Sequence, residues 1–104
     1  MIPIKFKQWN CLLVGAYYGN GRKAIELVDS ETHEPIARAT TNIPNVPLED
    51  DEVLIKDYSE NEGMADTLIA AGIIKPYTLN YVKSGFVHIH PFKLTVLSNE
   101  LWKK

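Results

Sequence analysis

The chain has 104 residues, of which 45% are hydrophobic and 23% charged, as in an ordinary globular protein with one modest core. The formal net charge of −2 argues against direct nucleic-acid binding, because nucleic-acid binders normally carry a basic face. The single cysteine, Cys11, excludes an intrachain disulfide and a cysteine-based zinc site. No apolar run is long enough to span a membrane, and residues 1–10 lack the apolar stretch of a signal peptide, so we expect a cytoplasmic protein.

Residues 2–8 alternate apolar and polar side chains, which predicts a half-buried strand, and Pro3 favours a sheet edge for its start. Residues 9–10 interrupt the alternation and predict a bulge or a turn. Residues 11–18 are mostly apolar and predict a second strand, in which Gly15 marks a bend or a close crossing.

The pair Asn20-Gly21 predicts a hairpin, because these residues suit the two positive-φ positions of a type I′ turn. Residues 23–29 are expected to form the returning strand. A tight connection over residues 30–35 and a strand over residues 36–42 follow, so that consecutive strands form an antiparallel meander. In the last of these strands the side chains expected to face the core are Ala37, Ala39 and Thr41, and those expected to face solvent are Arg38 and Thr40.

The only convincing helix is predicted over about residues 60–71, after a short buried strand over residues 53–56. Apolar residues at helical spacing give this segment a core-facing stripe. Ser59 and Glu62 have the spacing of a capping box, in which the two side chains satisfy free backbone N–H groups at the start of a helix. Gly72 supplies the left-handed residue that commonly ends a helix.

Residues 77–82 and 86–90 predict a second hairpin with its turn near residues 83–85, and residues 92–97 predict a last strand. The whole pattern is that of a single α+β domain over residues 1–104. We expect a mostly antiparallel, curled β-sheet, built from two hairpins and a meander, with one α-helix packed on it.

Acidic residues are concentrated before the predicted helix. Residues 49–62 hold seven acidic residues and one lysine, and the proline-containing segment before them predicts a surface loop. Three interpretations stay open: a solvated loop, a surface that attracts a basic partner, or a catalytic or metal-binding set, although the spacing is not that of an EF-hand. On the second interpretation the candidate partner-binding residues are Glu49, Asp50, Asp51, Glu52, Asp57, Tyr58 and Glu60.

His88 and His90 are weak candidates for metal ligands, because alternate residues of a strand point the same way. A metal site needs a third ligand, and the remaining histidine, His33, lies in a distant predicted turn. The simpler interpretation places both side chains on the solvent side of their strand. Cys11 lies in an apolar strand and has no obvious positively charged neighbour in the sequence, which indicates a buried structural thiol rather than a nucleophile. No cofactor is expected.

Four segments of the chain together form a recognisable sequence pattern: DSETHEP (29–35), ARATTNIP (37–44), IKDYSENEG (55–63) and SGFV (84–87). This pattern resembles a family of small uncharacterised proteins encoded on bacterial plasmids, conjugative elements and phages, and the third segment is its most specific part. The family has no assigned activity, so the resemblance implies no catalytic residue. The chain departs from the pattern at His33, where glycine is commoner, and a left-handed conformation there would carry modest strain.

These observations predict a non-enzymatic accessory protein of a mobile element that binds another protein through its acidic surface and an exposed aromatic edge. A sharper form is an inhibitor of a host defence or nucleic-acid-handling factor, whose basic surface the acidic residues would attract. The alternatives are a small metal-binding protein or metalloenzyme that uses His88 and His90, and a structural homodimer whose edge strands pair.

Overall fold

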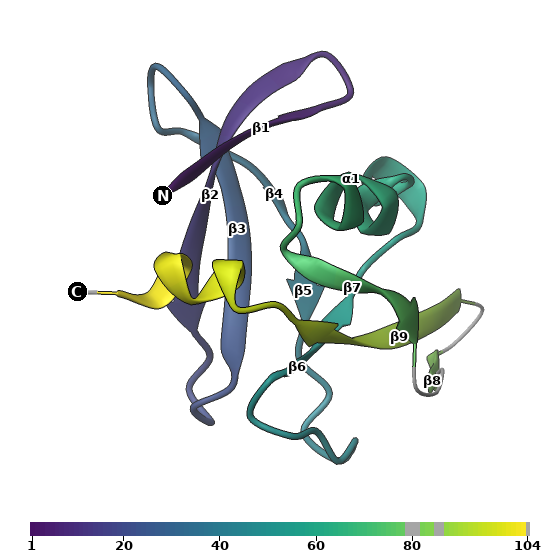
Figure 1. Cartoon of the computed structure of the whole chain (residues 1–104). Coiled ribbons are helices and arrows are strands. Elements are labelled where there is room, and N and C mark those ends of the chain that lie inside the picture. Colours follow the sequence, from purple (N-terminus) through teal and green to yellow (C-terminus); the bar gives the residue numbers. More distant parts are fainter. Residues whose placement is uncertain (79–81, 85–86, 104) are drawn as a thin grey trace.

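The computed structural model describes residues 1–78, 82–84 and 87–103, and it contains two antiparallel sheets and one α-helix (Figure 1). The first sheet confirms the predicted meander, because its strand order β1-β2-β3-β4 follows the chain. Its strands are β1 (Ile2–Phe6), β2 (Trp9–Tyr17), β3 (Lys23–Asp29) and β4 (Pro35–Arg38).

The second sheet has the order β5-β6-β9-β7, and every described strand pair in it is antiparallel. β9 also pairs with β8, so the predicted second hairpin is part of a larger arrangement centred on β9. Residues 79–81 and 85–86, which include part of its predicted turn, lie outside the described residues. The strands are β5 (Thr40–Thr41), β6 (Glu52–Ile55), β7 (Ile74–Thr78), β8 (Val82–Ser84) and β9 (Val87–Leu94).

The α+β class is therefore confirmed. The helical segment predicted at about residues 60–71 consists of a 3-10 turn, η1 (Ser59–Asn61), and the helix α1 (Met64–Ala70). Figure 1 shows α1 beside the first sheet and over β7 of the second. The last strand predicted over residues 92–97 is wrong in its second half, because β9 ends at Leu94 and the chain then forms the 3-10 helix η2 (Leu97–Trp102).

Both sheets, α1 and η2 contribute side chains to one core. In the first sheet the apolar residues alternate along the strands, so this sheet turns one face toward the core, whereas β6 of the second sheet buries Val53, Leu54 and Ile55 in succession. The fully buried members include Leu13, Ile25, Leu27, Ile55, Met64, Leu68 and Ile73.

The start of α1 differs from the predicted capping box. Ser59 has a φ of 53°, and its hydroxyl caps neither η1 nor α1. Asp57 takes this role instead: its Oδ1 accepts hydrogen bonds from the backbone N–H groups of Gly63 at 2.7 Å and Met64 at 3.0 Å. A carboxylate here also faces the positive end of the helix dipole. The prediction of a capping box is therefore wrong, because the side chain that caps α1 belongs to Asp57, which precedes the helical segment.

The predicted end of α1 is confirmed. Gly72 has a φ of 76° and donates its N–H to the carbonyl of Ile69 at 3.0 Å. The N–H of Ile73 donates to the carbonyl of Leu68 at 2.9 Å. These two bonds are the pattern of a Schellman motif, in which glycine adopts the left-handed conformation at little cost.

Two turns differ in detail from the prediction. Phe6 pairs with Trp9, so the first hairpin turns at residues 7–8 and not at residues 9–10. In the second hairpin Gly21 has a positive φ but Asn20 does not, which excludes type I′. The N–H of Gly21 donates to the Tyr18 carbonyl at 2.9 Å, as in a type I turn followed by a left-handed residue.

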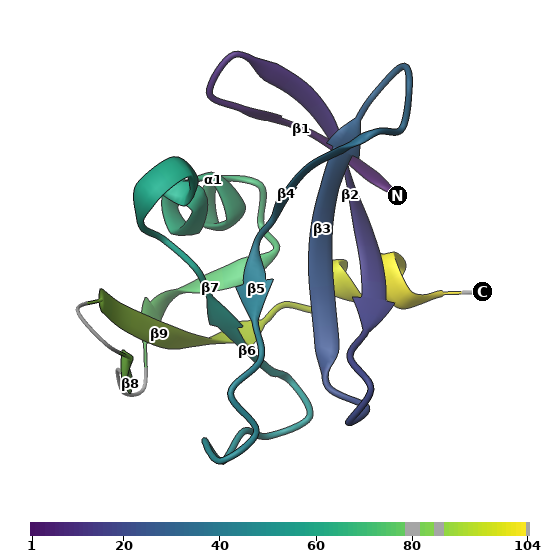
Figure 2. The ribbon, with the colours of Figure 1, turned by 180° about the vertical axis from the view of Figure 1, so that it is seen from behind.

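The chain passes from the first sheet to the second at Ala39, so the strand predicted over residues 36–42 is interrupted there (Figure 2). Ala39 is completely buried, and its N–H donates to the carbonyl of Ile25 in β3 at 2.9 Å. Its carbonyl accepts from the N–H of Lys56, just after β6, at 2.8 Å. Thr40 was expected to face solvent but is 1% exposed, because the change of sheet turns it inward.

Gly15 marks a close crossing, as the sequence predicted. A Cβ atom at Gly15 would lie 2.3 Å from the carbonyl oxygen of Leu101 in η2. The indole N–H of Trp102 donates to the carbonyl of Ala16 at 2.9 Å, which fixes η2 against β2. Glycine is therefore required at this position by space.

We predict that Gly15→Ala destabilises the fold by about 2 kcal/mol, because the added methyl group forces η2 away from β2. Gly19→Ala is the matched control, since nothing lies within 4 Å of a Cβ atom at that position. Urea denaturation of the two variants measures the difference. Equal stability of the two variants would contradict the close contact between η2 and β2.

We also predict that Asp57→Ala lowers the free energy of unfolding by about 1 kcal/mol, the usual cost of a lost helix cap. Ser59→Ala should change it by much less, since the Ser59 hydroxyl caps no helix. Thermal denaturation followed by circular dichroism compares the two variants. A larger decrease in the free energy of unfolding for Ser59→Ala than for Asp57→Ala would contradict the Asp57 cap and favour the capping box.

Candidate functional site

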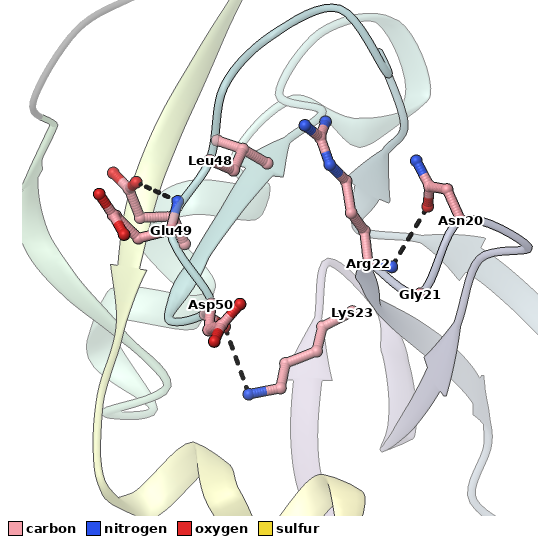
Figure 3. Close-up of a pocket in the computed structure, with 8 residues that line it drawn as sticks. Asn20, Gly21, Arg22, Lys23, Leu48, Glu49 and Asp50 are labelled. Atoms are coloured by element: carbon pink, nitrogen blue, oxygen red, sulfur yellow. Dashed lines mark hydrogen bonds between the residues drawn. The ribbon is translucent and has the colours of Figure 1, made fainter.

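The acidic segment, defined as residues 49–52, lies opposite the tip of the β2–β3 hairpin (Figure 3). A cleft of about 480 Å³ separates the two. One wall is acidic and the other is basic, so the cleft has a mixed charge. Its lining residues are Asn20, Gly21, Arg22, Lys23, Leu48, Glu49, Asp50 and Glu52.

Arg22 holds the loop that precedes the acidic segment. Its guanidinium group donates to the carbonyl of Ile43 at 2.8 Å and to the carbonyl of Val46, with a longer contact of 3.4 Å to Pro44. The five N–H donors of a guanidinium group can serve several carbonyls at once. Sequence reasoning missed this residue, because its partners lie more than twenty positions further along the chain.

Two of the four acidic residues are used inside the protein. The Glu52 carboxylate accepts the N–H of Glu49 at 2.8 Å and so closes the turn at the start of the acidic segment. The Asp51 carboxylate lies 3.1 Å from the Lys93 ammonium group in β9. The hydrogen bond from Lys93 lowers the pKa of Asp51, and the same contact raises the pKa of Lys93.

The other two acidic side chains, Glu49 and Asp50, are exposed. Within the part of the chain that the structure describes, neither carboxylate accepts a hydrogen bond or forms an ion pair. The nearby Lys23 makes only a long contact, 3.4 Å, to the backbone carbonyl of Asp50, while its ammonium group lies 5.2 Å from the centre of the Trp102 ring. Glu49 and Asp50 are therefore free to meet an external cation.

Asp57, Tyr58 and Glu60 do not join the acidic segment, because they follow the opposite end of β6. Asp57 caps α1, as described above. The carbonyl of Tyr58 accepts the N–H of Asn61 at 2.9 Å, and the carbonyl of Glu60 accepts the Lys7 ammonium group at 2.8 Å. The predicted set of seven residues thus divides into three that line the cleft, Asp51, which pairs with Lys93, and three beside the start of α1.

Among the aromatic side chains that the structure describes, the exposed ones do not form a continuous edge. Trp9 and Tyr17 are 41% and 60% exposed, but they stand at opposite ends of β2. Tyr18 is half-buried and its hydroxyl lies 2.9 Å from Oγ1 of Thr40, so this ring helps to close the fold. The exposed aromatic closest to the cleft along the chain is Tyr17, which pairs with Lys23 across the hairpin.

The histidine candidates remain a prediction. The backbone of β9 pairs His90 with Ile55 and His88 with Lys83, but the side chains of both histidines lie outside the described part of the structure. Among the residues that were described, no group of three potential metal ligands occurs. Cys11 is 1% exposed, and burial raises the pKa of its thiol, in agreement with a structural role.

In comparisons with known proteins, no family model, no curated protein and no solved structure matches the chain. The resemblance to mobile-element proteins therefore stays a prediction. None of the described helices has the length and apolar character that crossing a membrane requires. The case for a function rests on the geometry of the cleft and the acidic segment.

The ion pair between Asp51 and Lys93 predicts a pH dependence of stability. Because the pKa of Asp51 is lowered in the folded protein, the pair contributes fully above the unfolded-state pKa of about 3.9, and this contribution is lost as the pH falls through the folded-state value. We expect Asp51→Asn to be less stable than the wild type near neutral pH, and the difference to shrink toward zero in strong acid.

Chemical denaturation at a series of pH values measures this difference. Lys93→Gln provides the control background, because without its partner the Asp51→Asn substitution should lose the pH-dependent part of its effect. A difference that stays constant from neutral to acid pH would contradict the pairing.

Proposed function

We propose that the protein is a non-enzymatic module that binds another protein, and that Glu49 and Asp50 are its principal contacts. The observation that carries this proposal is that both carboxylates are exposed and unpaired within the described structure, although their backbone is held in place. The partner would present lysine or arginine side chains, which supply the missing positive charge.

A fixed loop suits this role because binding then costs little ordering of the chain. Arg22 anchors the loop through the carbonyls of Ile43 and Val46, and the Glu52 carboxylate closes the turn at Glu49. Asp51 also links the acidic segment to β9 through its ion pair with Lys93. A partner cation would therefore meet carboxylates that are already positioned and that need not leave an internal partner.

We also propose where the partner comes from and what kind of protein it is. The resemblance to mobile-element proteins favours a bacterial host as the source of the partner, in which case the protein would act as an accessory factor of such an element. An acidic surface is suited to block a basic surface that handles nucleic acid, since the two compete for the same lysine and arginine side chains. The sharper form is thus an inhibitor of a host defence or nucleic-acid-handling factor.

The test is affinity capture from a bacterial lysate with the wild type and with Glu49→Lys/Asp50→Lys. The matched control is Glu31→Lys/Glu100→Lys, which makes the same change of charge at two exposed acidic residues outside the cleft. A protein identified by mass spectrometry is then titrated with each variant at low and high salt.

We expect the acidic-segment variant to bind the partner at least roughly tenfold more weakly and the control to bind like the wild type, with an affinity that falls as salt rises. Capture of the same protein by the acidic-segment variant, or binding that does not depend on salt, would contradict the proposal.

A further inference from the structure

A groove of about 480 Å³ runs along β1, at an edge of the first sheet that pairs with no further strand in the described chain. Figures 1 and 2 both show α1 next to this part of the sheet. Because three successive residues of β1 line the groove and no residue of β2 does, it follows the free edge of the strand. Its lining residues are Pro3, Ile4 and Lys5 on one side and Asp66, Thr67, Ala70 and Ala71 on the other.

The backbone groups of β1 that face this groove have no partner among the described residues. Asn10, which lies opposite Lys5, accepts the N–H of Ser30 with its carbonyl at 3.0 Å and so faces β3 rather than β1. Opposite residues in an antiparallel pair alternate between bonded and non-bonded, so the N–H and carbonyl of Lys5 point away from β2, as does the carbonyl of Pro3. No hydrogen bond of the described chain uses these three groups. Such an edge is a template for an added strand.

The two walls of the groove run in opposite directions. The ammonium group of Lys7, just after β1, donates to the carbonyl of Glu60 in η1 at 2.8 Å. Because η1 precedes α1, the end of β1 lies beside the start of the helix (Figure 1). Lys5 and Asp66 therefore stand at the same end of the groove, and Ala70 stands toward the other. Both charged side chains are exposed, and neither forms an ion pair within the described chain.

We propose that the groove binds an extended segment of a partner protein, which adds to β1 as an antiparallel strand. The partner residue opposite Lys5 exchanges two backbone hydrogen bonds with it. The next partner residue lies opposite Ile4. Its side chain points to the same side as that of Ile4, toward the core to which α1 contributes, and packs beside Ala70. This position therefore takes an apolar side chain.

The two unpaired charges determine the rest of the segment. The partner residue opposite Lys5 is acidic, because oppositely charged neighbours across two strands attract each other. The residue before it lies opposite Phe6 and points to the α1 side, near Asp66, so it is basic. The segment thus reads, in chain order, a lysine or arginine, an aspartate or glutamate, and an apolar residue such as valine.

A second copy of the chain fits this groove less well than an isolated segment. Its β1 would bring its own β2 along on the side where α1 forms the far wall. In a symmetric pairing centred on Ile4, Lys5 would also lie opposite the second copy's Pro3, which has no N–H to donate to the Lys5 carbonyl. The groove shares no lining residue with the cleft beside the acidic segment, so this site is additional to the function proposed above.

An NMR titration of the isotope-labelled full chain tests the proposal. The probe is the acetylated and amidated peptide Thr-Lys-Glu-Val-Thr at up to about 5 mM, the range of weak peptide binding. The Lys5 amide should shift, and a peptide with its lysine and glutamate exchanged should bind roughly tenfold more weakly. The variant Lys5→Glu/Asp66→Lys should reverse this preference. A peptide that is N-methylated at its glutamate should not bind, because it cannot donate to the Lys5 carbonyl.

The acidic-segment variant Glu49→Lys/Asp50→Lys should bind the peptide like the wild type, so this site and the proposed function stand or fall separately. No shift of the Lys5 amide, undiminished binding of the N-methylated peptide, or an unchanged preference in Lys5→Glu/Asp66→Lys would each overturn the proposal. A shift of the Lys5 amide that grows with protein concentration in the absence of peptide would also overturn it, because it would assign the groove to a second copy of the chain.

Discussion

The structure depends on the buried backbone of Ala39, which is hydrogen-bonded to both sheets. Its N–H donates to Ile25 in the first sheet, and its carbonyl accepts the N–H of Lys56 at the end of the second sheet's β6. The side chains around it reinforce the junction: Oγ1 of Thr40 accepts the N–H of Ile25, and the Asn61 amide donates to the carbonyls of Arg38 and Lys56. Because unpaired backbone groups in a buried segment are costly, neither sheet can separate from this segment without exposing or orphaning these groups.

The position of the acidic segment follows from this junction. The hairpin tip belongs to the first sheet and the acidic segment leads into the second, so the cleft between them exists only while the two sheets keep their relative placement. Arg22 then spans the two parts by donating to carbonyls of the loop after β5. In this way a contact between the sheets near the centre of the molecule fixes the carboxylates of Glu49 and Asp50 at its surface.

The features that the sequence predicted correctly are those that depend on residues close together along the chain. Alternation located the strands of the first sheet, and Gly72 located the end of α1. It did not predict what depends on distant segments: the cap of α1 comes from Asp57 because the turn through η1 returns the chain to it, and Thr40 is buried because the chain changes sheets there. The same limit holds for the site. A cluster of acidic residues was evident, but which of them remain free was not, since the partner of Asp51 lies forty-two positions away.

The cleft beside the acidic segment requires that the two sheets form one rigid unit. Native-state amide hydrogen exchange measured by NMR tests this requirement most directly. We predict that the amides of Ala39 and Lys56 are among the slowest in the protein and exchange only through global unfolding, as core amides do. Fast exchange at these two amides, with slow exchange inside each sheet, would show that the sheets separate readily and would contradict a fixed cleft.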